Sequence, residues 1–382
     1  MSKLIDITGK AISGEWGQEA LEGEGIPVLR TTNFTNEGII KYDDVVNRHI
    51  TKKNIADKML RKGDIIIEKS GGSDKQPVGR VVYFEGEENK FLFNNFTGLL
   101  RVKDTKKWMP RYVFYSLYGN YINGGTKAFE NRTTGLHNLQ TDSYVMATEV
   151  RDVTLDEQAQ IVNQLDCVLE LIAKHRKQLA FLDVLVKSRF IELFGNPVLN
   201  DKGWEQKSLG ELTTKIGSGA TPKGGKAAYR EDGITLIRSM NVHNGQFEYK
   251  DLAHISDEQA SRLDNVTIEE DDVLLNITGA SVARCCIAPA EIIPARVNQH
   301  VCIVRCKDFI APEFLNHLLI DDNYQDLLWS IAGSGATREA ITKQQVENLQ
   351  IILPPAELQN EFMNFVKQVD KSKHFSELEV AA

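Results

Sequence analysis

Cysteine is scarce in this sequence, with five residues among 382, an odd number that shows no framework spacing. A disulfide scaffold is therefore excluded, and we expect free thiols in a reducing compartment. A zinc site has little more support. His300, Cys302 and Cys306 lie close together, but VCIVRC (301–306) is typical of a buried strand, and no pair of CxxC motifs accompanies it. We expect no metal and no cofactor in this chain itself.

Long apolar runs are absent too. No stretch approaches the roughly 18 apolar residues that a membrane-spanning helix needs, and the first residues lack the apolar core of a signal peptide. Hydrophobic residues make up 42% of the chain and charged residues 26%, which are ordinary proportions for a folded, water-soluble protein. We therefore expect a cytoplasmic protein of two or three domains with no membrane partner.

The usual motifs of catalysis are missing. GSGATPKGGK (217–226) has glycines and lysines, but it lacks the spacing of a phosphate-binding loop and the hydroxyl residue after the last lysine. Neither GNPV (195–198) nor LPPA (353–356) matches the Asn-Pro-Pro-aromatic motif of enzymes that methylate an exocyclic amine. There is also no nucleophile elbow, HExxH helix or nuclease-like cluster of carboxylates and lysine. We predict no catalytic residues, and an enzyme acting alone is the weakest interpretation.

Basic residues are fewer than acidic ones, with 45 Lys and Arg against 53 Asp and Glu, and the formal net charge is −8. A nucleic-acid partner needs Lys and Arg, so this total at first argues against one. The charge is unevenly spread, however, because residues 1–150 hold 21 Lys and Arg against 19 Asp and Glu. Binding depends on a local surface rather than on the whole chain, and nucleic acid is therefore not excluded as a partner.

What the sequence does contain is an internal repeat, which fixes architecture more securely than local propensity. The aligned segments are GIPVLRTTNF (25–34) with GITLIRSMNV (233–242), GDIIIEKSGG (63–72) with DDVLLNITGA (271–280), Arg80 with Arg284, Asn94 with Asn298, and VNQLD (162–166) with VKQVD (366–370). We predict two diverged copies of one mixed α/β (α+β) module, each followed by a helix.

The clearest periodic signal lies in the first helical segment, from Ile161 to Leu193. Apolar residues recur there at steps of four and three, at Ile161, Leu165, Val168, Ile172, Leu179, Leu182, Val186 and Leu193. Asp156 and Glu157 give a negative first turn and GNP (195–197) stops the pattern, which predicts a helix of about 35 to 40 residues and 50 to 60 Å. We expect a spacer that packs against one partner helix; a helix lying flat on a globular core is the alternative.

The partner helix is predicted in the second copy, after Pro354 and Pro355. Its apolar positions follow the same steps, at Leu358, Phe362, Phe365 and Val369. The pattern fades toward HFSELEVAA (374–382), so we expect about 25 residues here against roughly 40 in the first helix. Part of the first helix would then lack a cover of equal length.

Polar turns recur in both copies where strand-like segments end. Arg suits the edge of guanine and Asn that of adenine, while Gly- and Ser-rich turns expose N–H groups that can hold phosphates. The residues concerned are Arg30, Thr31, Thr32, Asn33, Lys69, Ser70, Gly71 and Gly72 in the first copy, and Arg238, Ser239, Asn241, Thr278 and Gly279 in the second. An ordinary hydrogen-bonded turn is the alternative for each residue, but recurrence favours a shared function.

Further polar positions join this set of predicted DNA contacts. FENRTTGLHNL (129–139) and GSGATREAITK (333–343) each lead toward a helix and carry arginines, which could equally form surface ion pairs. NNF (94–96) and NQH (298–300) are weaker candidates, because Asn commonly caps a turn. The additional residues are Arg80, Asn94, Asn95, Arg132, Thr133, Arg284, Asn298, Gln299 and Arg338.

Three segments carry a resemblance to a known family. LDEQAQIVNQLD (155–166), LDVLVKSRFIELFGNP (182–197) and PPAELQNEFMNFVKQVDKSK (354–373) closely resemble the specificity subunits of type I restriction-modification enzymes. The helical segments match strongly and the repeat layout matches throughout, whereas the globular parts match only in general pattern. The resemblance implies two target recognition domains, each reading half of a split DNA site, held apart by two antiparallel helices with pseudo-twofold symmetry.

The resemblance also divides the chain and supplies its partners. It implies a first target recognition domain at 1–150, a central coiled-coil helix at 151–196, a second recognition domain at 197–353 and a short distal helix at 354–382. In that family the subunit is not catalytic: modification subunits carry S-adenosylmethionine and methylate adenine, while restriction subunits use ATP and Mg²⁺ to translocate and cleave DNA. A coiled-coil adaptor that does not bind DNA is the main alternative to this interpretation.

Overall fold

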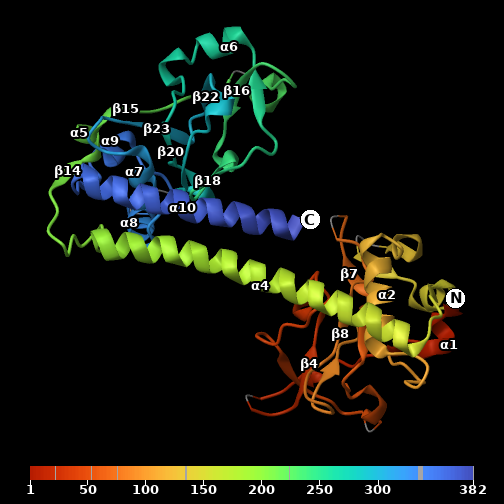
Figure 1. Cartoon of the computed structure of the whole chain (residues 1–382). Helices are drawn as coiled ribbons and strands as arrows, with labels where there is room; N and C mark the ends of the chain where they lie inside the picture. The colour runs from red at the N-terminus through yellow and green to blue at the C-terminus, as the bar shows by residue number, and fades with distance from the viewer. Residues whose placement is uncertain are drawn as a thin grey trace. The chain divides into compact units, whose positions relative to one another are not determined.

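The computed structural model describes residues 1–21, 23–52, 54–74, 76–133, 136–222, 224–333 and 339–381. The chain forms two compact units, residues 1–171 and residues 172–382 (Figure 1). The boundary lies inside one continuous helix, α4 (Leu155–Phe194). Both units mix helices with sheets, as the sequence predicts.

Unit 1 contains two four-stranded sheets. The first sheet is antiparallel and has the strand order β2 (Ile12–Ser13), β10 (Thr97–Leu100), β6 (Ile65–Glu68), β8 (Val81–Tyr83). The second sheet has the strand order β3 (Gln18–Glu19), β5 (Val46–His49), β4 (Ile26–Leu29), β9 (Leu92–Phe93), and in it β4 and β9 are parallel. The smaller sheets are β11 (Glu130–Thr133), β12 (Leu136–Leu139), β7 (Ser70–Gly72), and β1 (Ser2–Lys3) with β13 (Glu149–Val150). The helices are α1 (Leu4–Thr8), α2 (Pro110–Ile122), α3 (Thr141–Ala147) and the start of α4, with short 3-10 turns at Thr31–Asn33, Ala56–Lys58 and Lys127–Phe129.

Unit 2 has its own sheets. Its largest sheet has the order β15 (Thr213–Ser218), β23 (Val301–Cys306), β20 (Val273–Asn276), β21 (Cys285–Ile287), and a second has β19 (Ala253–Ile255), β16 (Ile234–Ile237), β22 (Ala295–Val297), with β16 and β22 parallel. Two pairs complete it, β14 (Gln206–Ser208) with β24 (Gln350–Ile352) and β17 (Val242–His243) with β18 (Gln246–Phe247).

The helices of unit 2 cover these sheets and end the chain. They are the end of α4, α5 (Leu209–Leu212), α6 (Asp257–Ser261), α7 (Pro312–Leu319), α8 (Asp322–Gly333), α9 (Lys343–Glu347) and α10 (Ala356–Ala381), with 3-10 turns at Gly225–Ala228, Ser239–Asn241, Asp264–Val266, Gly279–Ser281 and Ala290–Ile292.

Strands β6 and β20 each begin with three consecutive apolar residues, because both faces of each strand are buried, and each ends in a buried polar residue, Glu68 or Asn276. Side chains alternate across a strand, so in β6 Ile65 and Ile67 enter the core that includes α2, while Ile66 enters a second core on the other face. In β20, Val273 and Leu275 face one core and Leu274 another. An uninterrupted apolar run, rather than an alternating one, is what such a strand requires.

Helix α4 begins and ends where the sequence predicts. Before its first turn, Glu157 accepts the backbone N–H of Thr154 at 2.9 Å, and Thr154 Oγ1 accepts the Glu157 N–H at 3.3 Å, which is a capping box. At the other end Gly195 takes a φ of +74°, a conformation that suits glycine, and its N–H reaches the Ile191 carbonyl at 2.8 Å. The helix has 40 residues.

A fully buried glutamine fixes the start of α4 to unit 1. Gln158 is 0% exposed. Its Oε1 accepts the Met109 N–H at 2.8 Å, and its Nε2 donates to the carbonyls of Lys107 and Val153 at 2.9 and 3.1 Å. Met109 is the cap of α2, so one amide side chain joins the first turns of two helices.

Gln359 does the same for α10 in unit 2 and is 2% exposed. Its Oε1 accepts the N–H of Ala311, the cap of α7, at 3.0 Å. Its Nε2 donates to the carbonyls of Pro354 and Phe309 at 2.9 and 3.4 Å. Helices α4 and α10 are thus each anchored at their first turn by the same type of side chain.

Within unit 2, α10 runs antiparallel to the last part of α4 (Figure 1). Arg189 pairs with Glu361 at 2.6 Å, and Asp183 pairs with Lys373 at 2.7 Å, so the numbers fall along α4 as they rise along α10. The apolar contact is aromatic: the ring of Phe362 lies 5.4 Å from that of Phe190, measured between centroids.

The predicted apolar face of these helices is partly wrong. Leu165 and Val168 are 38% and 52% exposed rather than covered. The buried apolar positions of α4 are Val162, Val186, Phe190 and Phe194, of which only Val186 belongs to the predicted set. Ile161, Leu182 and Leu193 pack at core edges, and Ile172 and Leu179 are half-buried. In α10, Phe362 and Val369 are buried, Leu358 and Phe365 pack beside them, and Met363 and Val366 are additional members. A step of four replaces the heptad because this part of α4 packs on a globular core as well as on one helix.

Candidate nucleic-acid interface

In unit 1 the fold brings two predicted polar turns together. Leu29, at the end of β4, pairs in parallel with Phe93, at the end of β9. Because the carboxyl ends of parallel neighbours meet at one edge of a sheet, the turn of residues 30–33 (the Arg30 turn) lies beside that of residues 94–97 (the Phe96 turn). The Asn94 N–H donates to the Leu29 carbonyl at 2.9 Å and ties the two turns together.

Unit 2 brings its own two turns together in the same way. Ile237 of β16 pairs in parallel with Val297 of β22. The turn of residues 238–241 (the Arg238 turn) therefore lies beside that of residues 298–301 (the His300 turn). The Asn298 N–H donates to the Ile237 carbonyl at 3.0 Å. Polar side chains that are distant in sequence thus share one edge in each unit.

Arg30 is held by an acidic neighbour. Its Nη2 donates to the carboxylate of Asp44 at 2.7 Å and to the carbonyl of the same residue at 3.0 Å. The Arg30 side chain is 25% exposed and that of Asp44 81%. The guanidinium therefore faces solvent with part of its charge neutralised, and an incoming acceptor would compete with an exposed carboxylate.

Arg238 occupies the corresponding place without a carboxylate. Its guanidinium carbon lies 5.3 Å from the centre of the Tyr229 ring, and its Nη2 donates to the Asp251 carbonyl. Among the described residues no acidic side chain pairs with it. A guanidinium stacked on an aromatic ring is oriented while its charge stays available to a base or phosphate.

Asn33 and Asn241 do not face outward, and the prediction that they contact bases is wrong for this conformation. They are 2% and 0% exposed. The Oδ1 of each accepts the N–H of the arginine three residues earlier, at 2.8 and 3.1 Å. Their Nδ2 groups donate to carbonyls of the following loop. The alternative of a hydrogen-bonded turn is therefore correct for these two residues, which hold the arginines in place.

Arg80 and the first Asn of each neighbouring turn are also buried. Arg80 is 9% exposed, and it donates to the carbonyls of Phe34 and Thr31 at 2.9 and 3.0 Å. It also pairs at 3.4 Å with Glu68, whose pKa burial raises. Asn94 and Asn298 are 4% and 5% exposed. These three predicted contacts are likewise corrected, because their side chains are buried.

Several N–H groups of the predicted phosphate-holding turns are already hydrogen-bonded within the protein. Ser70, Gly71 and Gly72 form strand β7, which pairs with β12, and the N–H groups of Lys69 and Ser70 both donate to the Phe96 carbonyl, at 2.8 and 3.2 Å. In unit 2 the Gly279 N–H donates to Glu339 at 2.9 Å. These N–H groups are therefore not available to a phosphate, whereas the side chains of Lys69 and Thr278 remain candidates.

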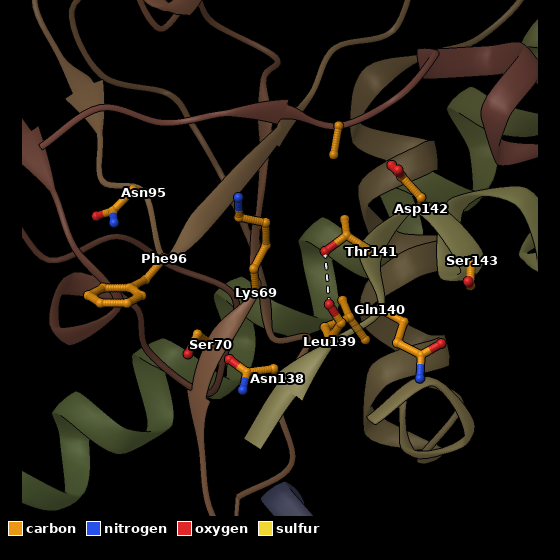
Figure 2. Close-up of a pocket in the computed structure, with 11 residues that line it drawn as sticks. Lys69, Ser70, Asn95, Phe96, Asn138, Leu139, Gln140, Thr141, Asp142 and Ser143 are labelled. Atoms are coloured by element: carbon orange, nitrogen blue, oxygen red, sulfur yellow. Dashed lines mark hydrogen bonds between the residues drawn. The ribbon is translucent and has the colours of Figure 1, made fainter. Parts of the chain in front are cut away.

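An open pocket of about 670 Å³ lies where the Phe96 turn meets β7 and β12. In Figure 2, Asn95 and Phe96 lie on one side of Lys69, and Thr141, Asp142 and Ser143 lie on the other. Lys69 Nζ donates to Ser13 Oγ at 2.8 Å, and burial lowers the pKa of Lys69, with a smaller effect from the charge of Lys58. An open pocket lined by lysine and amide groups is suited to bind a polar, anionic partner.

The other predicted contacts have various positions. Thr32, Asn95 and Gln299 are exposed, and Thr31, Ser239, Thr278 and Arg284 are half-buried. Arg132 and Thr133 lie in β11, whereas Arg338 falls outside the described residues. These residues stay predictions.

Two exposed apolar residues at these edges were missed. Phe96 is 52% exposed, and Met240, in the middle of the Arg238 turn, is 44% exposed. A search for charged and amide groups passes over them, although a bulky apolar residue inside a polar turn is itself a signal.

The sequence prediction also omits Lys52 and Lys58. Both lysines bind the carboxylate of Glu15, Lys52 at 2.8 Å, and both lower the pKa of Glu15. Two positive charges therefore lie beside one negative charge.

Other kinds of site find no support in the part of the chain that the structure describes. No group of three or more His, Cys, Asp or Glu side chains there is arranged to hold a metal ion. Cys285 and Cys302 are buried thiols, and burial raises the pKa of Cys302 to about 12. None of the described helices has the length and apolar character needed to cross a membrane.

Comparison with known sequences connects this geometry to a family. Residues 201–379 match the model of the type I restriction modification DNA specificity domain. The chain is 23% identical over 389 residues to a putative type I restriction enzyme MjaX specificity subunit of Methanocaldococcus jannaschii, with 96% of this chain and 86% of the relative covered. It is 22% identical over 379 residues to the type I restriction enzyme EcoBI specificity subunit of Escherichia coli, with 88% and 77% covered.

Two solved structures share the fold. One is a chain from a study of complex assembly and conformational transition of the type I R-M system, with a TM-score of 0.59 and 17% identity over 99% of this chain and 93% of that one. The other is the type I restriction-modification system S subunit of M. genitalium, with a TM-score of 0.56 and 14% identity over 99% and 91%.

Proposed function

Because the chain belongs to the family of type I restriction-modification specificity subunits, we propose that it selects the DNA sequence on which a type I complex acts. The observation that carries this proposal is the pair of Arg turns. Each follows a strand with a parallel neighbour, each is pinned by a buried Asn, and each presents one guanidinium at the edge of its unit. Arginine at a rigid turn is the side chain most used to read guanine in the major groove.

We further infer that the two units are copies of one recognition module. The larger sheets have corresponding orders, β2-β10-β6-β8 and β15-β23-β20-β21. Gln158 and Gln359 make corresponding hydrogen bonds to the caps of α2 and α7. Two copies joined by pseudo-twofold symmetry would read two half-sites of a split DNA target.

The proposed spacer is α4 together with α10, packed as an antiparallel coiled coil. The 40 residues of α4 rise about 60 Å at 1.5 Å each, which equals roughly 18 base pairs at 3.4 Å each. The length of this helix would set the number of unread base pairs between the half-sites. The antiparallel contacts of Arg189 with Glu361 and Asp183 with Lys373 support this arrangement.

The proposed partners supply the chemistry. This chain would contribute no catalytic residue, while modification subunits would bring S-adenosylmethionine and restriction subunits would bring the ATP- and Mg²⁺-dependent activity. A net charge of −8 is compatible with this division, because partner subunits that embrace the duplex can provide many of the phosphate contacts. An adaptor that does not bind DNA finds no support among the relatives.

The test is to express the chain with its modification subunit and to map adenine methylation across the host genome by single-molecule sequencing. We expect one split motif of two short half-sites. R30A and R238A, made separately, should each relax a different half-site. Absence of any methylated motif, with the assembled complex demonstrated by size-exclusion chromatography, would contradict the proposal.

A further inference from the structure

Phe96 stands out because its backbone is fixed while its ring is not covered. Its carbonyl accepts the N–H groups of Lys69 and Ser70. The turn is closed by Thr97, whose N–H and Oγ1 both donate to the Asn94 carbonyl, at 3.1 and 2.9 Å. The ring nevertheless remains 52% exposed. A large apolar group held on a rigid turn loses little conformational freedom on binding, which is a property of contact residues.

The place of this ring in unit 1 is beside the proposed DNA contacts. The Phe96 turn is bonded to Leu29, the residue directly before Arg30. Phe96 also lines the open pocket with Lys69 and Asn95, and Figure 2 shows Asn95 and the Phe96 ring together on one side of Lys69. An apolar surface among lysine and amide groups matches a DNA groove better than an apolar protein surface, because the surroundings favour anionic and hydrogen-bonding partners.

Unit 2 places a different side chain at the same point. The His300 carbonyl accepts the Ile277 N–H at 2.9 Å, just as the Phe96 carbonyl accepts that of Lys69 at 2.8 Å. The His300 ring is hydrogen-bonded on both nitrogens, to Thr278 Oγ1 and, at 3.0 Å, to Gln299 Nε2. At this position unit 1 therefore has a half-exposed aromatic ring, that of Phe96, whereas unit 2 has a polar network around His300.

We propose that Phe96 is a specificity-determining residue that contacts the 5-methyl group of a thymine in the half-site read by unit 1, and that the polar His300–Gln299 pair occupies the matching position in unit 2. This inference rests on the proposed function and adds a base preference to it. Among the base edges in the major groove, the thymine methyl is the apolar one, and an apolar side chain is its natural partner. The half-sites thus differ because residues 96 and 300 differ in chemistry.

The experiment uses the full chain assembled with its modification subunit and synthetic duplexes carrying the mapped motif. Each thymine is replaced in turn by deoxyuridine, which removes only the methyl group. R30A, in the neighbouring turn, first identifies the half-site of unit 1. We expect one replacement in that half-site to weaken binding about fourfold, the effect of one buried methyl group.

Matched variants separate the side chain from the fold. F96A should bind thymine and uracil duplexes equally, and F96L, which keeps an apolar surface, should retain part of the difference. H300A should leave the uracil effect in this half-site unchanged.

A uracil effect that persists in F96A, or a half-site with no thymine that responds, would overturn the inference while leaving the proposed function intact. Absence of sequence-specific binding by the complex that contains the wild-type chain would instead overturn the proposed function, and the inference with it.

Discussion

The carboxylate of Asp44 lies 2.7 Å from the guanidinium of Arg30, whereas Arg238, at the corresponding turn, donates to the backbone carbonyl of Asp251. Two arginines with the same proposed task thus differ in how much of their charge is free. Asp44 is 81% exposed at its side chain, so its negative charge also faces an approaching phosphate. Substituting Asp44 and Asp251 in turn therefore tests whether a paired carboxylate weakens the binding of DNA by the neighbouring arginine.

We expect D44N to strengthen DNA binding by the complex about two- to fivefold, because it removes one exposed ion pair and one repulsive charge. D251N is the matched control. Asp251 has a φ of +56°, which Asn tolerates, and only its carbonyl contacts Arg238, so D251N removes a nearby negative charge without breaking an ion pair and should strengthen binding less than D44N does. Fluorescence anisotropy with a labelled duplex at fixed salt measures both. Equal responses of the two variants would show that the Asp44 carboxylate does not restrain Arg30.

Arg238 and Asn241 should give different phenotypes although they are three residues apart. R238A should cost about 1 to 3 kcal/mol at one position of one half-site if the guanidinium reads a base. N241A should instead lower the free energy of unfolding by about 1 to 3 kcal/mol, because it leaves the Arg238 N–H and two loop carbonyls without partners.

Methylation mapping and denaturant unfolding separate the two outcomes. If N241A changes the recognised base while the stability is unchanged, Asn241 is a contact residue after all.

The two buried glutamines give a paired stability prediction. Q158A and Q359A each remove three hydrogen bonds beneath a helix start, so each should destabilise its own unit by about 1 to 3 kcal/mol. Q160A, at an exposed position of the same helix, should have little effect. Hydrogen exchange monitored by mass spectrometry reports on each unit separately. Loss of protection in both units from either substitution would contradict the assignment of one anchor to each unit.

Acid should weaken unit 2 through His317. Burial against the edge of the Phe362 ring, whose centroid lies 5.2 Å away, lowers the pKa of His317 to about 4, with a smaller effect from Lys373. The unfolded chain takes up this proton near pH 6.5 and the folded chain only near pH 4, so the stability is complete above pH 6.5 and falls by up to about 3 kcal/mol toward pH 4.

The check is to compare the pH dependence of unfolding in the wild type and in H317N, which cannot take up that proton. The difference between the two curves should develop between pH 6.5 and pH 4. Parallel curves would exclude His317 as the source.

The sequence predicts regular elements well and side-chain direction less well. The bounds of α4 follow from its capping residues and Gly195, and β6 and β20 follow from apolar runs, because these are local signals. The repeat pairs the Arg30 turn with the Arg238 turn, and in the structure each of them follows a strand that has a parallel neighbour. Whether a turn side chain points out or in depends on contacts with distant loops. The sequence therefore predicts DNA contacts for Asn33 and Asn241, whereas in the structure they bond to residues up to eleven positions away.

The stretch of α4 between Leu169 and Leu182 contributes to none of the hydrophobic cores found among the described residues, whereas Gln158 and Gln359 close each unit onto its own helix start. A recombination event between two genes of this type that falls within this stretch would exchange one whole unit without opening either core. Under the proposed function, such an exchange would give the protein a new DNA target, because each half brings its own turns and its own anchor.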